Sequence, residues 1–168
     1  MRFTIRPYEP ADQDWLLASE IALQEHERAV HDPRLPLTRR PALPYTHEYI
    51  ALLWETLREK QGAMLIAVDA EGRQAGLVAG NVADAPWPME MPDSTRYGYV
   101  ADIYIEPRAR GSGLARILLD AIAAHLHAVA PDLTRLRINV MAANAIARGA
   151  YEKAGFIPYE VMYERKLP

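Results

Sequence analysis

Apolar residues in the first half of the chain recur at two spacings, which predict strands and helices in turn. Phe3 and Ile5 alternate with polar residues, and two apolar runs, 64–68 and 74–82, flank the short turn "DAEGR". Alternation and a glycine turn are typical of strands and of a hairpin. Between them, apolar positions at helical spacing predict one helix from Pro10 to about Ala29 and another from a capping Thr46 to Gly62.

The second half of the chain repeats this change of spacing. We expect strands over residues 97–105, 136–140 and 157–167, and helices over residues 114–129 and 144–154. Two segments rich in proline, 31–44 and 84–94, are expected to be loops. Strands before and between helices, without a linker, predict a single α/β domain over residues 1–168 with a mixed sheet.

Composition excludes several classes of protein. The chain has 168 residues, no cysteine, a formal net charge of −3 and a pI near 6.0. Disulfides and thiolate metal sites are therefore excluded, and the basic surface typical of a nucleic-acid partner is missing. No apolar stretch is long and uncharged enough for a membrane span or a signal peptide, so we expect a cytoplasmic protein.

The stretch "RARGSGLARILL", residues 108–119, places two glycines where a strand gives way to a helix. Glycine allows a positive φ and close approach of a backbone, and the first amides of a helix bind anions readily. The loop therefore suits a phosphate or carboxylate, with charge added by Arg110, Arg116 and Arg108. The alternative is a structural turn with solvated arginines. The triphosphate-binding and dinucleotide-binding glycine motifs are both incomplete here.

Two sequence blocks resemble the GNAT (Gcn5-related) N-acetyltransferase family. The family's acetyl-CoA loop, V/I-x-P-x-x-R-G-x-G-[ILV]-[GA], is matched by Ile105, Pro107, Arg110, Gly111, Gly113, Leu114 and Ala115. Its second block, N-x-x-A-x-x-x-Y-x-x-x-G-F, is matched by Asn144, Ala147, Tyr151, Gly155 and Phe156. One helix and one strand separate the blocks, as in the family. The match is most specific over about residues 97–156, and it implies a mostly antiparallel mixed sheet flanked by helices.

The resemblance implies acetyl-CoA as cosubstrate, with no metal. The backbone from Arg110 to Ala115, including Ser112 and Gly113, would hold the pyrophosphate, with Arg116 beside it. The strand would pair with the pantetheine arm through Ile103, Tyr104 and Ile105. Asn144 and Ala147 of the second block would lie against the cofactor, although asparagine at a helix start is also an ordinary cap.

The resemblance also implies catalytic roles. Tyr151 matches the family's general acid, which protonates the CoA thiolate, and a backbone amide near Tyr104 or Ile105 would stabilise developing oxyanion charge. Asp102 is the acid of its strand that could accept the amine proton. Some similar polyamine-type enzymes place a glutamate before this aspartate, where this chain has Ala101. Asp102 could instead pair with an arginine or hold the substrate amine.

The acceptor is less constrained by the sequence. Glu25 could attract a cationic amine and His26 could act as a base near neutral pH, unless both lie on a solvated helix face. Trp87 could line an acceptor pocket, form a dimer contact or cap an edge of the core, and Arg34, Arg39 and Arg40 could instead hold a carboxylate. We expect direct transfer to a primary amine of a small molecule. A protein N-terminus or lysine as acceptor, or a non-catalytic module that binds acyl-CoA, are the alternatives. Homodimers are frequent in similar proteins.

Overall fold

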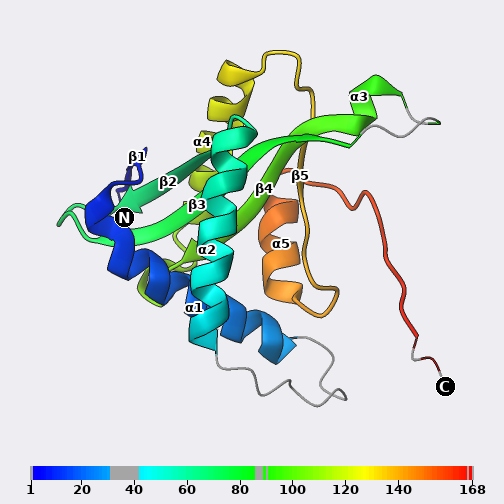
Figure 1. Cartoon of the computed structure of the whole chain (residues 1–168). Helices are drawn as coiled ribbons and strands as arrows, with labels where there is room; N and C mark the ends of the chain where they lie inside the picture. Colours follow the sequence, from blue (N-terminus) through cyan, green and yellow to red (C-terminus); the bar gives the residue numbers. More distant parts are fainter. Residues whose placement is uncertain (1, 31–41, 86–88, 90, 166, 168) are drawn as a thin grey trace.

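The structure is a computed structural model, and it describes residues 2–30, 42–85, 89, 91–165 and 167. A twisted sheet carries helices on both faces (Figure 1). Along the chain the elements are β1 (Thr4–Pro7), η1 (Pro10–Asp12), α1 (Gln13–Val30), α2 (Ala42–Glu59), β2 (Ala63–Val68), β3 (Gln74–Asp84), α3 (Pro92–Thr95), β4 (Arg96–Ile105), η2 (Pro107–Ala109), α4 (Leu114–Val129), β5 (Leu136–Ile138) and α5 (Ala145–Lys153).

The sheet has the order β1-β2-β3-β4-β5. Neighbouring strands are antiparallel except β4 and β5, which run parallel. This confirms the mixed, mostly antiparallel sheet. β5 pairs with β4 only from Gly98 to Val100, whereas β3 pairs with β4 as far as Ile105. The second half of β4 is therefore paired with β3 along one edge only. Along its other edge, no strand of the described chain pairs with it.

Two apolar cores hold the helices against the sheet. On one face, Leu16 of α1 and Leu53 of α2 pack against Leu77 of β3. On the other face, α4 packs a stripe that includes Leu118 against Val78 of β3, and α5 lies beside it. Leu77 and Val78 are adjacent and serve opposite cores, as the alternation of a strand requires. Burial of both faces fixes the register of the central strands.

A β-bulge in β4 determines which core Asp102 faces. Ala79 is opposite Asp102 and Gly80 is opposite Val100, so Ala101 is an extra residue in β4. Val100 belongs to the core on the α4 side. Simple alternation would point Asp102 the same way, but the inserted residue reverses the alternation, and Asp102 meets Tyr49 of α2. The bulge thus directs a carboxylate to the space between the sheet and α1 and α2.

Several predicted boundaries are wrong. Thr46 does not cap α2, which begins at Ala42; its buried side chain instead donates a hydrogen bond to Gln24 Oε1 at 3.1 Å. The segment 84–94 is not all loop, because it contains the end of β3 and the start of α3. β5 ends at Ile138, two residues earlier than predicted.

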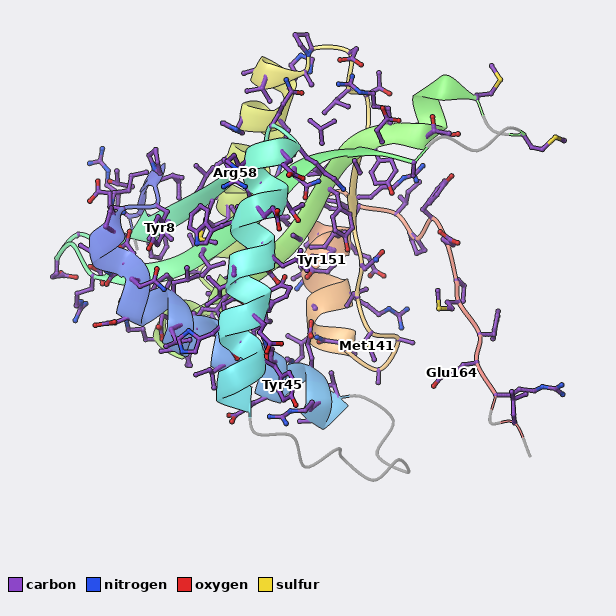
Figure 2. All side chains as sticks on the ribbon, in the orientation of Figure 1. Tyr8, Tyr45, Arg58, Met141, Tyr151 and Glu164 are labelled. Atoms are coloured by element: carbon purple, nitrogen blue, oxygen red, sulfur yellow. The ribbon has the colours of Figure 1, made fainter. Side chains whose placement is uncertain are left out.

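The predicted final strand, 157–167, does not form. Its described residues run away from the sheet, where Figure 2 shows Glu164 far from the helices. Alternating apolar residues make a strand only where a partner edge is available, and this segment leaves the edge of β5 uncovered. Its side chains at Ile157, Val161 and Tyr163 are consequently exposed.

Candidate functional site

The loop between β4 and α4 has the backbone of an anion cradle. Gly111 and Gly113 adopt positive φ values of 75° and 84°, in the left-handed region that favours glycine. A Cβ added at either position would meet nothing within 4 Å, so the space beside each glycine is open. Leu114 is buried in the core and anchors the first turn of α4. The first turn of α4, with the amides and positive dipole end that a helix start offers to an anion, therefore directly follows the two glycines.

The arginines around this loop have different roles. Arg110 donates from Nε to the carbonyl of Ile105 at 3.2 Å, and Arg116 lies 3.7 Å from Asp120 on the exposed face of α4. Arg108 is bound to Asp69 at 2.6 Å and also donates to the carbonyl of Gln74. The expectation that Arg108 adds charge to the cradle is therefore wrong, because its guanidinium already neutralises a buried carboxylate.

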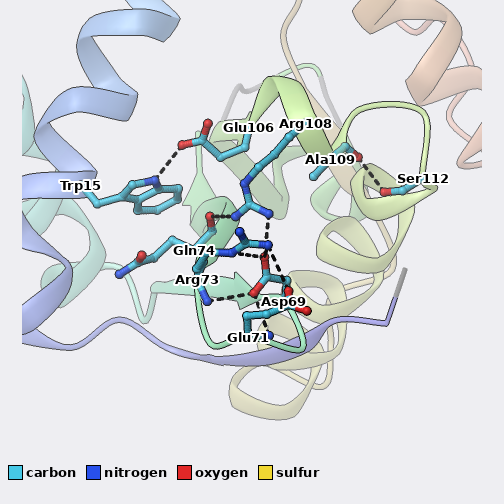
Figure 3. A network of polar contacts seen from close by, with 9 residues as sticks. All are labelled: Trp15, Asp69, Glu71, Arg73, Gln74, Glu106, Arg108, Ala109 and Ser112. Atoms are coloured by element: carbon cyan, nitrogen blue, oxygen red, sulfur yellow. Dashed lines mark hydrogen bonds and ion pairs between the residues drawn. The ribbon is translucent and has the colours of Figure 1, made fainter.

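A network of polar contacts fixes the loop to the rest of the fold (Figure 3). Trp15 of α1 donates its indole N–H to Glu106 at 2.8 Å, at the end of β4. Arg108 connects the loop to Asp69 in the β2–β3 turn, and Ser112 Oγ donates to the carbonyl of Ala109 at 2.6 Å. Two separate elements, α1 and the β2–β3 turn, thus hold the loop in place, and the Ser112 bond closes it internally, so that its backbone is preorganised.

β4 runs between this loop and the point at Val100 beyond which β5 no longer pairs with it; we call this point the split between β4 and β5. Ile103 and Ile105 pack toward the α4 core, and Tyr104 faces the opposite core, where its ring lies 6.3 Å from that of Trp15. The backbone of this part of β4 has β3 on one side only. An extended chain that carries amides can pair with such an edge without help from side chains.

α5 places the second sequence block across from β4. Asn144 caps the helix by accepting a hydrogen bond from the amide of Ala147 at 3.1 Å, which confirms the capping role. Its Nδ2 lies 3.5 Å from Nε2 of His26 on α1. Tyr151, labelled on α5 in Figure 2, is partly buried beside Phe156. Burial, and secondarily the charge of Glu27, raise the pKa of Tyr151 to about 12, so the hydroxyl keeps its proton at neutral pH.

The acids between the sheet and the first two helices form a buried cluster. Asp102 is 8% exposed and accepts a hydrogen bond from the Tyr49 hydroxyl. Burial raises the pKa of Asp102, and the hydrogen bond from Tyr49 opposes that rise. Glu20 of α1 is 1% exposed, and neither of its carboxyl oxygens has a hydrogen-bond partner in the described structure. Burial and the charge of Asp102 raise the pKa of Glu20 strongly.

The predicted acceptor residues lie in different places. Glu25 and His26 are exposed on α1, and of the two only His26 reaches α5. Trp87, Arg34, Arg39 and Arg40 lie outside the described residues. The sequence analysis missed Glu20 and the partnership of Tyr49 with Asp102. A signal for Glu20 was present, because Leu16, Glu20 and Glu27 share one stripe of α1 at helical spacing.

Comparison with known proteins identifies the family. The model of the Acetyltransferase (GNAT) family matches residues 23–156, which is most of the chain. The chain therefore belongs to the GNAT family of acetyltransferases, enzymes that use acetyl-CoA to acetylate amines. No curated protein matches the chain. None of the described helices is long and apolar enough to cross a membrane.

Solved structures share the fold over nearly their whole length. A mutant of the BH1408 protein from Bacillus halodurans is 18% identical, with a TM-score of 0.74 and coverage of 98% of this chain and 99% of that one. A predicted acetyltransferase from Clostridium acetobutylicum, solved with acetyl-CoA, is 20% identical, with a TM-score of 0.65 and coverage of 98% and 96%. The aminoglycoside antibiotic 6'-N-acetyltransferase AAC(6')-Ih from Acinetobacter baumannii is 15% identical, with a TM-score of 0.65 and coverage of 99% of both chains.

Proposed function

We propose that this enzyme moves the acetyl group of acetyl-CoA directly to a primary amine of a small molecule, with both substrates bound at once. The observation that carries the proposal is the split between β4 and β5. Beyond it, β4 runs on toward the open glycine loop, and we place the reaction where β4 carries Asp102 and α5 carries Tyr151. The Glu27 charge raises the pKa of both groups, so both lie within its electrostatic reach.

The residues of the loop and strand fit acetyl-CoA. We propose that the backbone from Arg110 to Ala115 binds the pyrophosphate, where the open left-handed glycines leave room for it. Arg110 and Arg116 would add positive charge at the rim. The free edge of β4, from Ile103 to Ile105, would pair with the amides of the pantetheine arm. Asn144 would contact the cofactor with its Nδ2 while its oxygen caps α5.

Two side chains would move the protons of the reaction. Bound acetyl-CoA supplies a thioester, whose C–S bond breaks as the amine forms the new N–C bond. Asp102, with its raised pKa, would accept the proton that the ammonium must lose before attack. Tyr151, which stays protonated at neutral pH, would donate its proton to the departing sulfur. The nitrogen loses two protons on becoming an amide: Asp102 would take the first before attack, and the second, lost after the N–C bond forms, balances the proton that Tyr151 gives to sulfur.

The burial of the acids favours a small acceptor. Asp102 and Glu20 lie under α1 and α2, where a folded protein surface would not reach without moving these helices. One structural neighbour is an aminoglycoside antibiotic 6'-N-acetyltransferase, which agrees with a small amine as acceptor. A lysine side chain or protein N-terminus is the second candidate, and its test is part of the same assay.

The assay follows release of CoA with a thiol reagent. Because the chain has no cysteine, every thiol detected comes from CoA. Acetyl-CoA is offered with a panel of primary amines, with a tertiary amine as a non-acceptor control and with a lysine-containing peptide. Turnover with small primary amines and not with the peptide supports the proposal. Turnover with the peptide alone contradicts it.

Asp102→Asn tests the base. If Asp102 accepts the proton, the variant is slow at low pH and recovers as the pH approaches the range in which the amine is already neutral. A pH profile identical to that of the parent would exclude this role.

We also propose a homodimer and a cytoplasmic location. Ile157, Val161 and Tyr163 expose apolar side chains on the segment after α5, and a second copy could cover them. Light scattering on the parent and on Val161→Asp tests the dimer, and a monomeric parent would refute it. The location follows from the proposed use of acetyl-CoA, an intracellular metabolite.

A further inference from the structure

Glu20 is an unusual residue for the buried stripe of an amphipathic helix. Four residues after Leu16, it faces inward on α1 and is almost completely buried. Both carboxyl oxygens lack a hydrogen-bond partner in the described structure. A buried carboxylate without a partner is costly, so a glutamate in this setting stays protonated unless a positive charge lies beside it. A ligand that satisfies Glu20 would remove that penalty.

The surroundings of Glu20 require a positively charged ligand. Asp102 on β4 and Glu27 on α1 are the charges that act on Glu20, and both are negative. Tyr49 of α2 already donates its hydroxyl to Asp102. Within the described residues, no arginine or lysine contributes to the electrostatics of Glu20. The described residues therefore give Glu20 no positive partner, so burial keeps it protonated in the free protein, and a cation bound beside it would favour its ionised form.

One positive charge does not balance the cluster. In the proposed reaction, the reacting amine gives its proton to Asp102 and attacks as a neutral group. Glu27 has the imidazole of His26 near it, which opposes the rise of its pKa. Glu20 is then the acid without a compensating charge, and a second ammonium on the same acceptor molecule would supply one.

We propose that the acceptor is a diamine or polyamine, and that the Glu20 carboxylate binds the ammonium that is not acetylated. This inference rests on the proposed acetyl transfer to a small amine. Glu20 is a specificity residue in this proposal: it binds a non-reacting group of the acceptor and takes no part in proton transfer.

The kinetic experiment compares 1,4-diaminobutane with 1-aminobutane as acceptors for the parent and for Glu20→Gln. The variant keeps the size of the side chain and removes its charge. Its kcat/KM for the diamine should fall by about 10- to 100-fold, as for the loss of a hydrogen bond to a charged group. Its kcat/KM for the monoamine should stay within about twofold. The matched control is Glu55→Gln, an exposed glutamate on α2, which should change neither value.

A binding experiment separates this inference from the proposed function. The diamine and the monoamine are titrated into the protein by calorimetry without acetyl-CoA. The parent should bind the diamine more tightly, and Glu20→Gln should lose that preference. If the diamine binds through Glu20 but no amine is acetylated, the cation site stands and the proposed function fails. If amines are acetylated but the two acceptors react alike in parent and variant, or lose rate equally in the variant, the assignment of Glu20 is overturned.

Discussion

The burial of Glu20 predicts a pH-dependent stability that does not depend on any substrate. The ordinary pKa of a glutamate is 4.5, and the fold raises it. The folded chain therefore binds a proton that the unfolded chain releases as the pH rises above 4.5. The free energy of unfolding must fall as the pH rises through the interval between the two pKa values. Above the raised pKa, the loss is complete and the slope ends.

The size of the effect follows from proton linkage. One proton held only by the folded state lowers the free energy of unfolding by about 1.4 kcal/mol per pH unit. For a domain of this size, that corresponds to roughly 3–6 °C of Tm per pH unit. Asp102, whose pKa is also raised, adds a slope of the same sign. Glu20→Gln removes one of the two contributions and keeps the shape of the side chain.

Thermal or urea denaturation at pH 5, 6 and 7 measures this slope. The variant should gain stability relative to the parent with each step in pH, and the two should differ least at pH 5. Glu55→Gln, exposed on α2, should follow the parent. Parallel curves for the parent and Glu20→Gln would refute the reasoning, because they would mean that Glu20 is not desolvated in solution.

Three further predictions concern the cradle and the catalytic groups. Gly113→Val places a β-branched residue at a φ of 84° and a side chain in the open space of the loop, so calorimetry should show acetyl-CoA affinity lost while thermal unfolding shows a cost of about 1–2 kcal/mol; unchanged affinity would exclude the cradle. Tyr151→Phe should lower kcat by about 10²- to 10⁴-fold with acetyl-CoA binding retained, and a rate near that of the parent would show that another group protonates the sulfur. Tyr49→Phe removes the hydrogen bond that lowers the pKa of Asp102, so the acid limb of the pH–rate profile should move to higher pH. An acid limb at the same pH as in the parent would mean that the protonation of Asp102 does not control the rate.

The features predicted well from the sequence are those encoded locally. The bounds of α4 and the loop before it depend on helical spacing, on Leu114 and on two glycines, all within a few residues of one another. The split of the sheet was not predictable in the same way, because it depends on where β5 stops pairing with β4, and β5 follows α4 in the chain. The site therefore combines a local motif with a non-local arrangement.

Two wrong predictions have distinct physical causes. The predicted strand over 157–167 has the alternation of a strand, but alternation cannot supply a partner edge. The start of α2 was placed too late because Pro44 was taken as a breaker, although the first turn of a helix tolerates proline. The bulge at Ala101 could not be predicted either, because it arises from pairing with β3 and leaves no mark in β4 itself.

Glu20 shows what closer attention to the sequence could have found. A carboxylate on the apolar stripe of a helix contradicts the pattern that defines the helix. Such contradictions tend to occur where function requires them, and here the charge of Asp102 acts on the residue. Tyr49, the partner of Asp102, carried no comparable signal, because a tyrosine fits an apolar stripe.

The central claim is that the glycine loop binds acetyl-CoA, and calorimetric titration of the protein with acetyl-CoA, CoA and ATP tests it most directly. The account predicts that acetyl-CoA and CoA bind with one site per chain and that ATP does not bind. If neither acetyl-CoA nor CoA binds, or if ATP binds equally well, the loop is structural or serves another anion, and the account is contradicted.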